Sequence, residues 1–465
     1  MVFASLTFLF GFFPLALLVY YAVPLRLRNG VLLLLNLIFY GWGEPILILV
    51  MLFSTAVNGA FGLFLEKAKE KEKRRKALAA AAISIDLSLL IFFKYTGLFT
   101  GALHSIPFLS FLPQVSVPLP LGISFYTFHV ISYIVDVYRS DAPAQKNPLL
   151  FGMYISLFPQ MIAGPITRYK QMQSQLAERR VTGSQFHDGV ALIVVGLVKK
   201  VLLANQMGKL WDVLRDAGSS AGILGAWAGA VAYALQIYFD FGGYTDMARG
   251  LGKLFGFELP INFNYPYTAR SVTDFWRRWH MTLSGWFRDY VYIPLGGSRK
   301  GKAVTLRNLL IVWCLTGFWH GASWNFLLWG FYYFVLLAVE KLFLLPILKC
   351  APAPLAHGYA VLTFLFGWML FANENFGVMG ARLALMCGFG RVLPDAAVSA
   401  TLISYLPLLA VGIAGCLPVV KKLAGRAASF RLRVPMECAG CVIAVALCTA
   451  SLLSQSYNPF LYFRF

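Results

Sequence analysis

The chain has 465 residues, of which 59% are hydrophobic and only 13% are charged, and its mean hydropathy is +0.68. Soluble domains carry about 25% charged residues, so this composition excludes an ordinary soluble protein. The net charge of +20 comes from lysines and arginines clustered between apolar stretches, as in cytoplasmic loops, and this pattern argues against a nucleic-acid partner. We therefore expect an all-α polytopic membrane protein of roughly ten spans, with residues 1–465 forming one integral domain.

The N-terminal half begins with apolar runs and a basic loop. Residues 1–23 have no basic residue before the apolar run and no small-residue cleavage site after it, which predicts a retained first span rather than a signal peptide. Two further apolar runs cover 31–42 and 46–65. Residues 66–76, EKAKEKEKRRK, predict a cytoplasmic loop. The next span is expected at 77–98.

Two segments after the proline-rich loop at 106–120 are unusual for helices that face lipid. Residues 120–139, PLGISFYTFHVISYIVDVYR, contain several polar side chains, including His129, and therefore predict a helix that lines the interior. Residues 158–169, FPQMIAGPITRY, place prolines and a glycine in an apolar context, which predicts a broken or re-entrant segment. The topology of residues 121–200 and the role of His129 stay open.

A span at 224–237 leads into YFDFGGYTDMARG, which holds two carboxylates, Asp240 and Asp246. Each carboxylate costs about 2.5–3.5 kcal/mol at the membrane centre, so both are expected at the membrane edge or in ion pairs. Arg249 lies three residues after Asp246 and is its nearest partner by sequence. Structural ion pairing and a role in a site both stay open for these aspartates.

The stretch from 271 to 330 carries two histidines, His280 and His320. Apolar residues recur at helical spacing across SVTDFWRRWHMTLSGWFRDY, which predicts one helix lying on the membrane surface, capped at Ser271. His320 follows Lys302 by 18 residues, a rise of about 27 Å along a helix, so we expect it deep in the bilayer. A histidine at that depth is a functional candidate, although a neutral histidine bonded to a neighbouring helix is the alternative.

The C-terminal part predicts spans at 324–345, 358–372, 401–420 and 435–453, with a basic loop between the last two. The final residues, SYNPFLYFRF, predict an aromatic tail in the headgroup region. The seven cysteines are odd in number and mostly single within apolar stretches, which favours packing over metal binding; no metal site is expected.

These motifs together resemble one family of membrane enzymes. LGISFYTF, FPQMIAGPITRY, YFDFGGYTDMARGLGKLFGF, NFNYPYTARSVTDFWRRWHMTLS, FRDYVYIPLGG and GFWHGASWNFLLWG are similar to the membrane-bound O-acyltransferase family, and within it to the bacterial alginate O-acetylation branch. The resemblance covers essentially the whole chain. It implies a ring of transmembrane helices, with re-entrant and interfacial helices, around a thinned central channel.

The resemblance also implies roles for individual residues. It makes His320, in its WHG context, the catalytic histidine and His280, in RRWH, the second histidine. The remaining candidates, which would bind the donor or line the pocket, are Arg277, Arg278, Trp279, Trp319, Asn325, Tyr244, Asp240 and Asp246. The implied donor substrate is acetyl-CoA with no permanently bound cofactor, and the implied partner is an extracytoplasmic acetyltransferase at the bacterial inner membrane.

The chemistry of the residues agrees with this resemblance. A neutral imidazole at His320 can remove the proton from an acceptor hydroxyl as that hydroxyl attacks a thioester, which is worth about 10²–10⁴ in rate. His280, near Arg277 and Arg278, can hydrogen-bond the thioester or position the donor. Two alternatives stay open: a membrane transporter, and the same chemistry with cellulose, peptidoglycan or a teichoic-acid-like polymer as acceptor.

Overall fold

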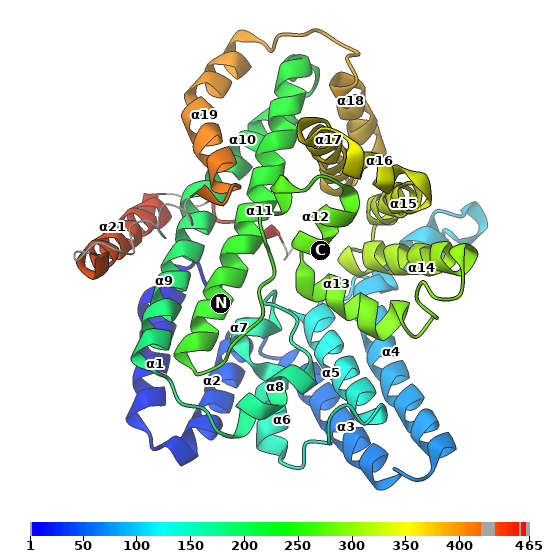
Figure 1. Ribbon diagram of the computed structural model, residues 1–465, viewed down its shortest axis with the longest axis vertical. Helices are drawn as coiled ribbons and strands as arrows, with labels where there is room; N and C mark the ends of the chain where they lie inside the picture. Colours follow the sequence, from blue (N-terminus) through cyan, green and yellow to red (C-terminus); the bar gives the residue numbers. More distant parts are fainter. Residues whose placement is uncertain (1, 420–432, 455–456, 462–465) are drawn as a thin grey trace. The chain divides into compact units, whose positions relative to one another are not determined.

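The structure is a computed structural model that describes residues 2–419, 433–454 and 457–461 (Figure 1). Within these residues the secondary structure is helical and contains no strand, as the composition predicted. The predicted basic loop residues from Lys421 to Arg431 lie outside the described part of the chain.

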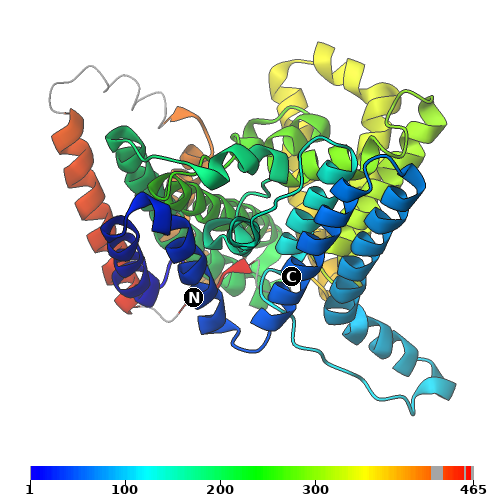
Figure 2. The same cartoon turned by 90° about the horizontal axis from the view of Figure 1, so that it is seen from below.

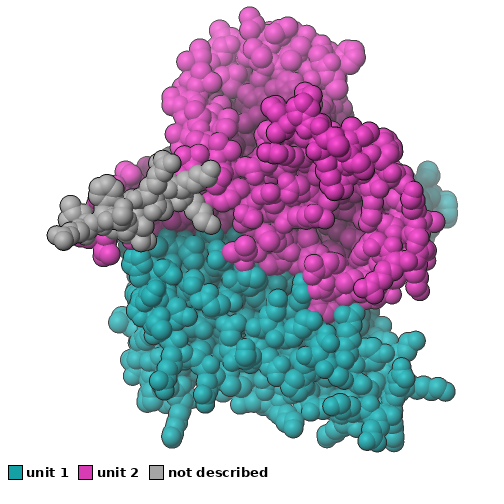
Figure 3. Space-filling model, viewed as in Figure 1, with its two compact units in different colours: residues 1–193, 245–260 teal, residues 194–244, 261–465 magenta. Residues whose placement is uncertain are grey.

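Contacts between Cα atoms divide the chain into two compact units, which Figure 3 colours separately. Unit 1 is Met1–Ile193 with Thr245–Pro260, and unit 2 is Val194–Tyr244 with Ile261–Phe465. The helices α9 (Gly183–Val198) and α11 (Gly222–Leu254) each contribute residues to both units.

The other helices of unit 1 include short helices and two that are long enough to cross a membrane. They are η1 (Thr7–Phe12), α1 (Phe13–Ala22), η2 (Leu25–Leu27), α2 (Arg28–Gly43), α3 (Ile48–Lys67), α4 (Glu72–His104), η3 (Pro107–Leu109), α5 (Ile123–Tyr138), α6 (Pro148–Ser156), α7 (Phe158–Met161) and α8 (Tyr169–Ala177). Figure 2 shows the long loop after α4 extending away from the helices around it, as the proline-rich sequence predicted.

Unit 2 contains both candidate histidines, because His320 ends α14 and His280 lies between α12 and α13. Its elements are η4 (Lys199–Ala204), α10 (Asn205–Asp216), η5 (Gly218–Ala221), η6 (Pro266–Thr268), α12 (Val272–Arg278), α13 (Met281–Phe287), η7 (Arg288–Tyr292), α14 (Lys302–His320), α15 (Trp324–Val339), η8 (Glu340–Leu344), α16 (Leu345–Cys350), α17 (Ala353–Ala372), α18 (Phe376–Met386), α19 (Ala396–Gly415) and α21 (Arg433–Ser454).

The described residues contain eight helices that are long and apolar enough to cross a membrane. They are Ile48–Lys67, Glu72–His104, Gly183–Asp216, Gly218–Leu254, Trp324–Cys350, Ala353–Ala372, Ala396–Gly415 and Val434–Ser454. Thr7–Ala22 and Phe376–Met386 are shorter apolar helices. The protein therefore crosses a membrane several times.

Two predictions for unit 1 are confirmed. α5 is buried along nearly its whole length and packs against α3 and α4, so its polar side chains face the interior rather than lipid. The segment at 158–169 is broken: α7 has only four residues, with Pro159 in its first turn. Gly164 allows the chain to turn back closely, because a Cβ there would collide with the carbonyl oxygen of Pro159.

The prediction of one surface helix over 271–290 is wrong. α12 ends at Arg278, α13 begins at Met281, and His280 between them has the left-handed conformation, with φ of 44°. The apolar side chains of both helices are buried, and those of α12 join the core of unit 2, so they meet protein rather than the membrane surface. The predicted cap is present, because the Ser271 hydroxyl accepts from the Asp274 amide at 2.9 Å.

Residues 457–461 of the predicted aromatic tail pack against the protein. The Phe460 ring stacks on Tyr244 at 4.7 Å between centroids, and both Phe460 and Leu461 are buried. Residues 462–465 lie outside the described part of the chain.

Cysteine packing is confirmed only in part. Cys416 and Cys448 are buried, whereas Cys350, Cys387 and Cys438 are exposed. An exposed thiol lies on a surface, so the apolar context of these three positions does not reflect packing inside the protein.

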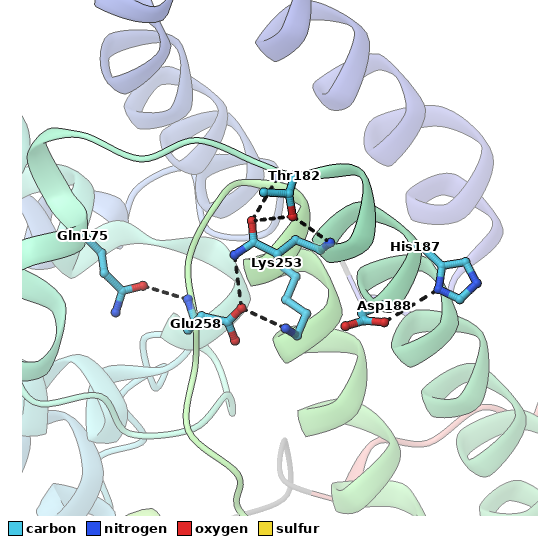
Figure 4. Close-up of polar contacts among 7 residues, drawn as sticks. Gln175, Thr182, His187, Asp188, Lys253 and Glu258 are labelled. Carbon is cyan, nitrogen blue, oxygen red and sulfur yellow. Dashed lines mark hydrogen bonds and ion pairs between the residues drawn. The ribbon is translucent and has the colours of Figure 1, made fainter. Parts of the chain in front are cut away.

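Polar contacts in unit 1 connect the end of α11 with the loop that follows it (Figure 4). Lys253 pairs with Glu258 at 2.8 Å, and the Glu258 amide donates to the side chain of Gln175 at 2.7 Å. The Glu258 side chain is half exposed, so this ion pair adds little stability.

Candidate active site

His320 is the last residue of α14 and lies among aromatic rings. Its ring centroid is 4.8 Å from that of Trp319, 5.1 Å from that of Trp329 and 5.2 Å from that of Phe371. The His320 side chain is only 6% exposed. These rings exclude bulk water and hold the imidazole in one place.

Asn325 fixes one wall of this aromatic cage. It lies in the first turn of α15 and is fully buried, and its amide nitrogen donates to the carbonyl oxygens of Leu370 and Phe371 at 3.3 and 3.0 Å. α15 and the end of α17 are thereby joined beside His320. Asn325, a predicted pocket residue, therefore stabilises the surroundings of the histidine.

His280 is held by a hydrogen bond from the loop that follows α11. Its Nδ1 lies 3.0 Å from Oδ1 of Asn262, which also accepts from the Thr282 amide and hydroxyl. Because this amide oxygen is surrounded by donors, Nδ1 carries the imidazole proton and Nε2 carries the lone pair. Burial lowers the pKa of His280, which lies in the break between two short helices, to about 3. The ring is therefore neutral.

Trp319 contacts both histidines. Its ring centroid lies 6.1 Å from that of His280 and 4.8 Å from that of the adjacent His320. The structure therefore brings together the two histidines that lie 40 residues apart in the sequence.

A cavity of about 290 Å³ with a mainly aromatic and aliphatic wall and a basic rim lies next to this cage. Arg277, Arg288 and Lys341 supply its cations, and Trp276 and Trp313 supply part of its wall. We call it the basic cavity. The rings of both tryptophans contact Trp329, at 5.6 and 6.0 Å. Because Trp329 also contacts His320, a continuous set of aromatic rings connects the basic cavity with the histidine.

The two adjacent arginines have different surroundings. Arg277 is exposed, lines the basic cavity and makes no hydrogen bond or ion pair with any residue that the structure describes. Arg278 is paired with Asp274 at 2.9 Å and is not among the residues that line the cavity. Of the two predicted donor-binding arginines, only Arg277 is placed to meet a ligand there.

Trp279 is a core residue. It is buried and packs against Trp368, Phe263 and Phe275, with the Trp368 ring at 4.7 Å. It follows directly from Arg278 and precedes His280, so its packing helps to fix the backbone of the histidine.

Asp240 belongs to a buried ion pair. Its Oδ1 lies 2.7 Å from Nζ of Lys200, both side chains are 3% exposed, and its Oδ2 accepts from the Leu461 amide at 2.8 Å. Lys200 also donates to the Pro459 carbonyl. The charges therefore hold the C-terminal segment, and Tyr244 packs on Phe460 of that same segment.

Asp246 and His129 lie in unit 1. Asp246 pairs with Arg249 at 3.5 Å, which confirms the partner expected from the sequence. His129 is fully buried in α5 beside Tyr154, and neither ring nitrogen has a hydrogen-bond partner among the described residues. Both residues therefore belong to a different unit from His320.

Several residues of the site carry no signal in the sequence. Asn262 precedes His280 by 18 residues, and Phe371 follows His320 by 51 residues. Glu340 falls inside the predicted span at 324–345, where its role has no local signal. Only the resemblance of the NFNYPY motif to the family offered a hint at Asn262.

Comparison with protein families agrees with this arrangement. The model of the membrane-bound O-acyltransferase family matches residues 47–379, which include both histidines and the cage around them. The chain belongs to the membrane-bound O-acyltransferase family. It is therefore an O-acyltransferase that crosses the membrane several times, and the transporter alternative is not supported.

Similar members of the family modify different polymers. A protein of Pseudomonas aeruginosa named "Probable alginate O-acetylase AlgI" is 35% identical to the chain over 100% of both sequences. The peptidoglycan O-acetyltransferase of Helicobacter pylori is 34% identical over 72% of this chain and 69% of its own length. The teichoic acid D-alanyltransferase of Bacillus subtilis is 30% identical over 48% of this chain and 59% of its own length.

Proposed function

We propose that this membrane-bound O-acyltransferase uses acetyl-CoA to O-acetylate a secreted or cell-surface polysaccharide, with alginate as the acceptor. The full-length similarity to alginate O-acetylases supports acetyl as the group and alginate as the polymer. The observation that carries the proposal is the contact of Trp319 with both His280 and His320, beside the basic cavity.

His320 is the general base of the proposed reaction. Its imidazole takes the proton of the acceptor hydroxyl as the hydroxyl oxygen attacks the thioester carbonyl. The new carbon–oxygen bond forms, the carbon–sulfur bond breaks, and the imidazolium returns its proton to the leaving thiolate. The aromatic cage of Trp319, Trp329 and Phe371 supports this role because it excludes the water that would hydrolyse the thioester.

His280 positions a substrate. Asn262 accepts from Nδ1, so Nε2 presents a lone pair and accepts a hydrogen bond, for example from an amide N–H of the donor's pantetheine arm. A neutral ring in this tautomer cannot donate from Nε2 to a thioester oxygen. Of the two roles considered from the sequence, positioning is therefore favoured over hydrogen bonding to the thioester.

The basic cavity binds the anionic part of the donor. Coenzyme A carries phosphate groups and an adenine ring, which suit the rim cations Arg277, Arg288 and Lys341 and the aromatic wall. Arg288 is paired with Asp289, so the unpartnered guanidinium of Arg277 is the main phosphate contact.

The proposed setting is the bacterial inner membrane. The basic cavity faces the cytoplasm, where coenzyme A resides and where basic residues are enriched. The acceptor hydroxyl approaches His320 from the other side, either on the polysaccharide or on an extracytoplasmic acetyltransferase that passes the acetyl group on.

The experiment supplies radiolabelled acetyl-CoA to the cytoplasmic side of membrane vesicles that contain the full-length protein, its native partners and alginate. Label should appear in alginate with the wild type and be absent with H320A at equal protein abundance. Label in peptidoglycan or a teichoic-acid-like polymer instead would replace the acceptor. If alginate stayed unlabelled with acetyl-CoA but became labelled when another radiolabelled acetyl donor was supplied, acetyl-CoA would not be the donor.

A further inference from the structure

Glu340 is a buried carboxylate at the junction of α15 and η8. It is fully buried and makes no ion pair with any residue in the described part of the chain. A buried charge without a cation is costly unless hydrogen bonds compensate for it. The hydrogen bonds of Glu340 therefore show which part of the protein this charge stabilises.

The Glu340 carboxylate accepts three hydrogen bonds from the beginning of α12. One carboxylate oxygen accepts from the Val272 amide at 2.6 Å, and the other accepts from the amide and the hydroxyl of Thr273 at 2.8 and 2.6 Å. The Ser271 hydroxyl accepts from the next amide, that of Asp274, at 2.9 Å. The first three amides of α12 are thus all satisfied, two of them by a residue 67 or 68 positions away.

α12 connects the basic cavity with the second histidine. Thr273, Trp276 and Arg277 line the cavity, and His280 follows two residues after the helix ends. A rigid helix transmits a shift at its first turn to its last, so the start of α12 determines where Arg277 and His280 lie.

α15 connects the same anchor with His320. Trp329 in α15 contacts the His320 ring, Glu340 follows the end of α15, and Lys341 after it lines the basic cavity. The path from His320 through Trp329, Glu340 and α12 to His280 closes through Trp319, which contacts both histidines.

We infer that Glu340 is a positioning residue for the transfer reaction. It fixes α12 to α15 and so sets the position of the basic cavity's cations relative to the two histidines. Its effect on catalysis rests on the proposed function. Its effect on α12 does not.

The test compares E340A and E340Q with the wild type, all as the full-length protein in lipid nanodiscs. The glutamine keeps one acceptor oxygen, so it retains part of the anchor, whereas alanine retains none. E258Q is the matched control, because Glu258 is an exposed glutamate of unit 1 whose carboxylate contacts Lys253 and Gln185 and no residue of α12 (Figure 4).

The first measurement is hydrogen–deuterium exchange of the peptide that covers residues 271–279. We expect the α12 amides to exchange at least tenfold faster in E340A, by an intermediate factor in E340Q, and as in the wild type in E258Q. Unchanged exchange in both Glu340 variants would overturn the inference. E340Q carries the test alone if E340A does not fold.

The second measurement is transfer from acetyl-CoA. A displaced α12 should raise the KM for the donor about tenfold in E340Q while the KM for the acceptor stays unchanged. General destabilisation would instead lower the amount of active enzyme and leave both KM values alone, which would also overturn a positioning role. A wild type that uses no acetyl-CoA would refute the proposed donor, and the exchange measurement would still decide whether Glu340 fixes α12.

Discussion

The ring of His280 lies 6.1 Å, centroid to centroid, from the indole of Trp319, the residue that directly precedes His320. One side chain therefore contacts the imidazoles of both histidines. This relationship makes the two histidines one site.

Removing the imidazole of His320 should abolish acyl transfer. General-base help is worth about 10²–10⁴ in rate, so H320A should lose at least a hundredfold in kcat. The measurement is acetyl transfer by purified protein at saturating donor. H320A should keep the wild-type elution profile in size-exclusion chromatography, because the aromatic cage remains. A folded H320A with wild-type kcat would remove His320 from the reaction.

Replacing Asn262 by aspartate should make activity sensitive to pH. The pKa of His280 is lowered by burial to about 3, so the wild-type ring stays neutral between pH 5 and 8. A carboxylate next to Nδ1 stabilises the imidazolium and raises that pKa. N262D should therefore lose activity as the pH falls from 8 to 5, when Nε2 becomes protonated.

The pH–rate profiles of the wild type and N262D check this prediction. N262L is the control, since it removes the hydrogen bond to His280 without adding a charge, and its profile should be lower but parallel to that of the wild type. Identical profiles for N262D and N262L would contradict it. The pKa of His280 also affects folding. Because this pKa is lower in the folded protein than in the unfolded chain, the free energy of unfolding decreases as the pH falls below about 6.5.

The adjacent arginines should differ in their effect on donor binding. R277Q should raise the KM for acetyl-CoA about tenfold or more, because a charge-assisted hydrogen bond is worth about 1.5–3 kcal/mol. R278Q is the matched control and should stay within about twofold, because Arg278 is engaged by Asp274 outside the cavity. Steady-state kinetics with varied donor measure both. Equal effects of the two substitutions would argue against the basic cavity as the donor site.

Breaking the buried ion pair of Lys200 and Asp240 should destabilise unit 2. Removing one partner leaves a buried charge unpaired, which costs about 3–5 kcal/mol. D240N and K200M should therefore each lower the thermal unfolding temperature in detergent by several degrees.

The double variant K200M/D240N should be less destabilised than the sum of the single changes, because neither charge is then left alone. D246N is the comparison, since Asp246 pairs with Arg249 at 3.5 Å on one helix and is less buried than Asp240. If D240N unfolded at the same temperature as the wild type, the ion pair would make no contribution to stability.

Local features of the sequence predicted much of the fold. The apolar runs predicted the spans, and the prolines and Gly164 predicted the broken segment at 158–169, because chain stiffness and missing amides act within a few residues. The pairing of Asp246 with Arg249 was predictable for the same reason, since both lie on one turn of a helix.

The tertiary structure decided how the histidines are held. Apolar spacing continued across the break at His280, and periodicity cannot distinguish one helix from two short helices with a left-handed residue between them. Nor can it tell whether an apolar face meets lipid or protein, so Trp276 and Trp279 were assigned to a membrane surface although both are buried.

The sequence by itself therefore determined the membrane class, the position of most helices and, through resemblance, the two histidines. Only the tertiary structure decided that Trp319 contacts both of them, that Asn262 sets the tautomer of His280 and that Glu340 anchors α12. The reason is physical. Helix periodicity and turn chemistry are local, whereas the contacts of Trp319 with His280, of Asn262 with His280 and of Glu340 with α12 join residues 18 to 68 positions apart and form only when the helices pack.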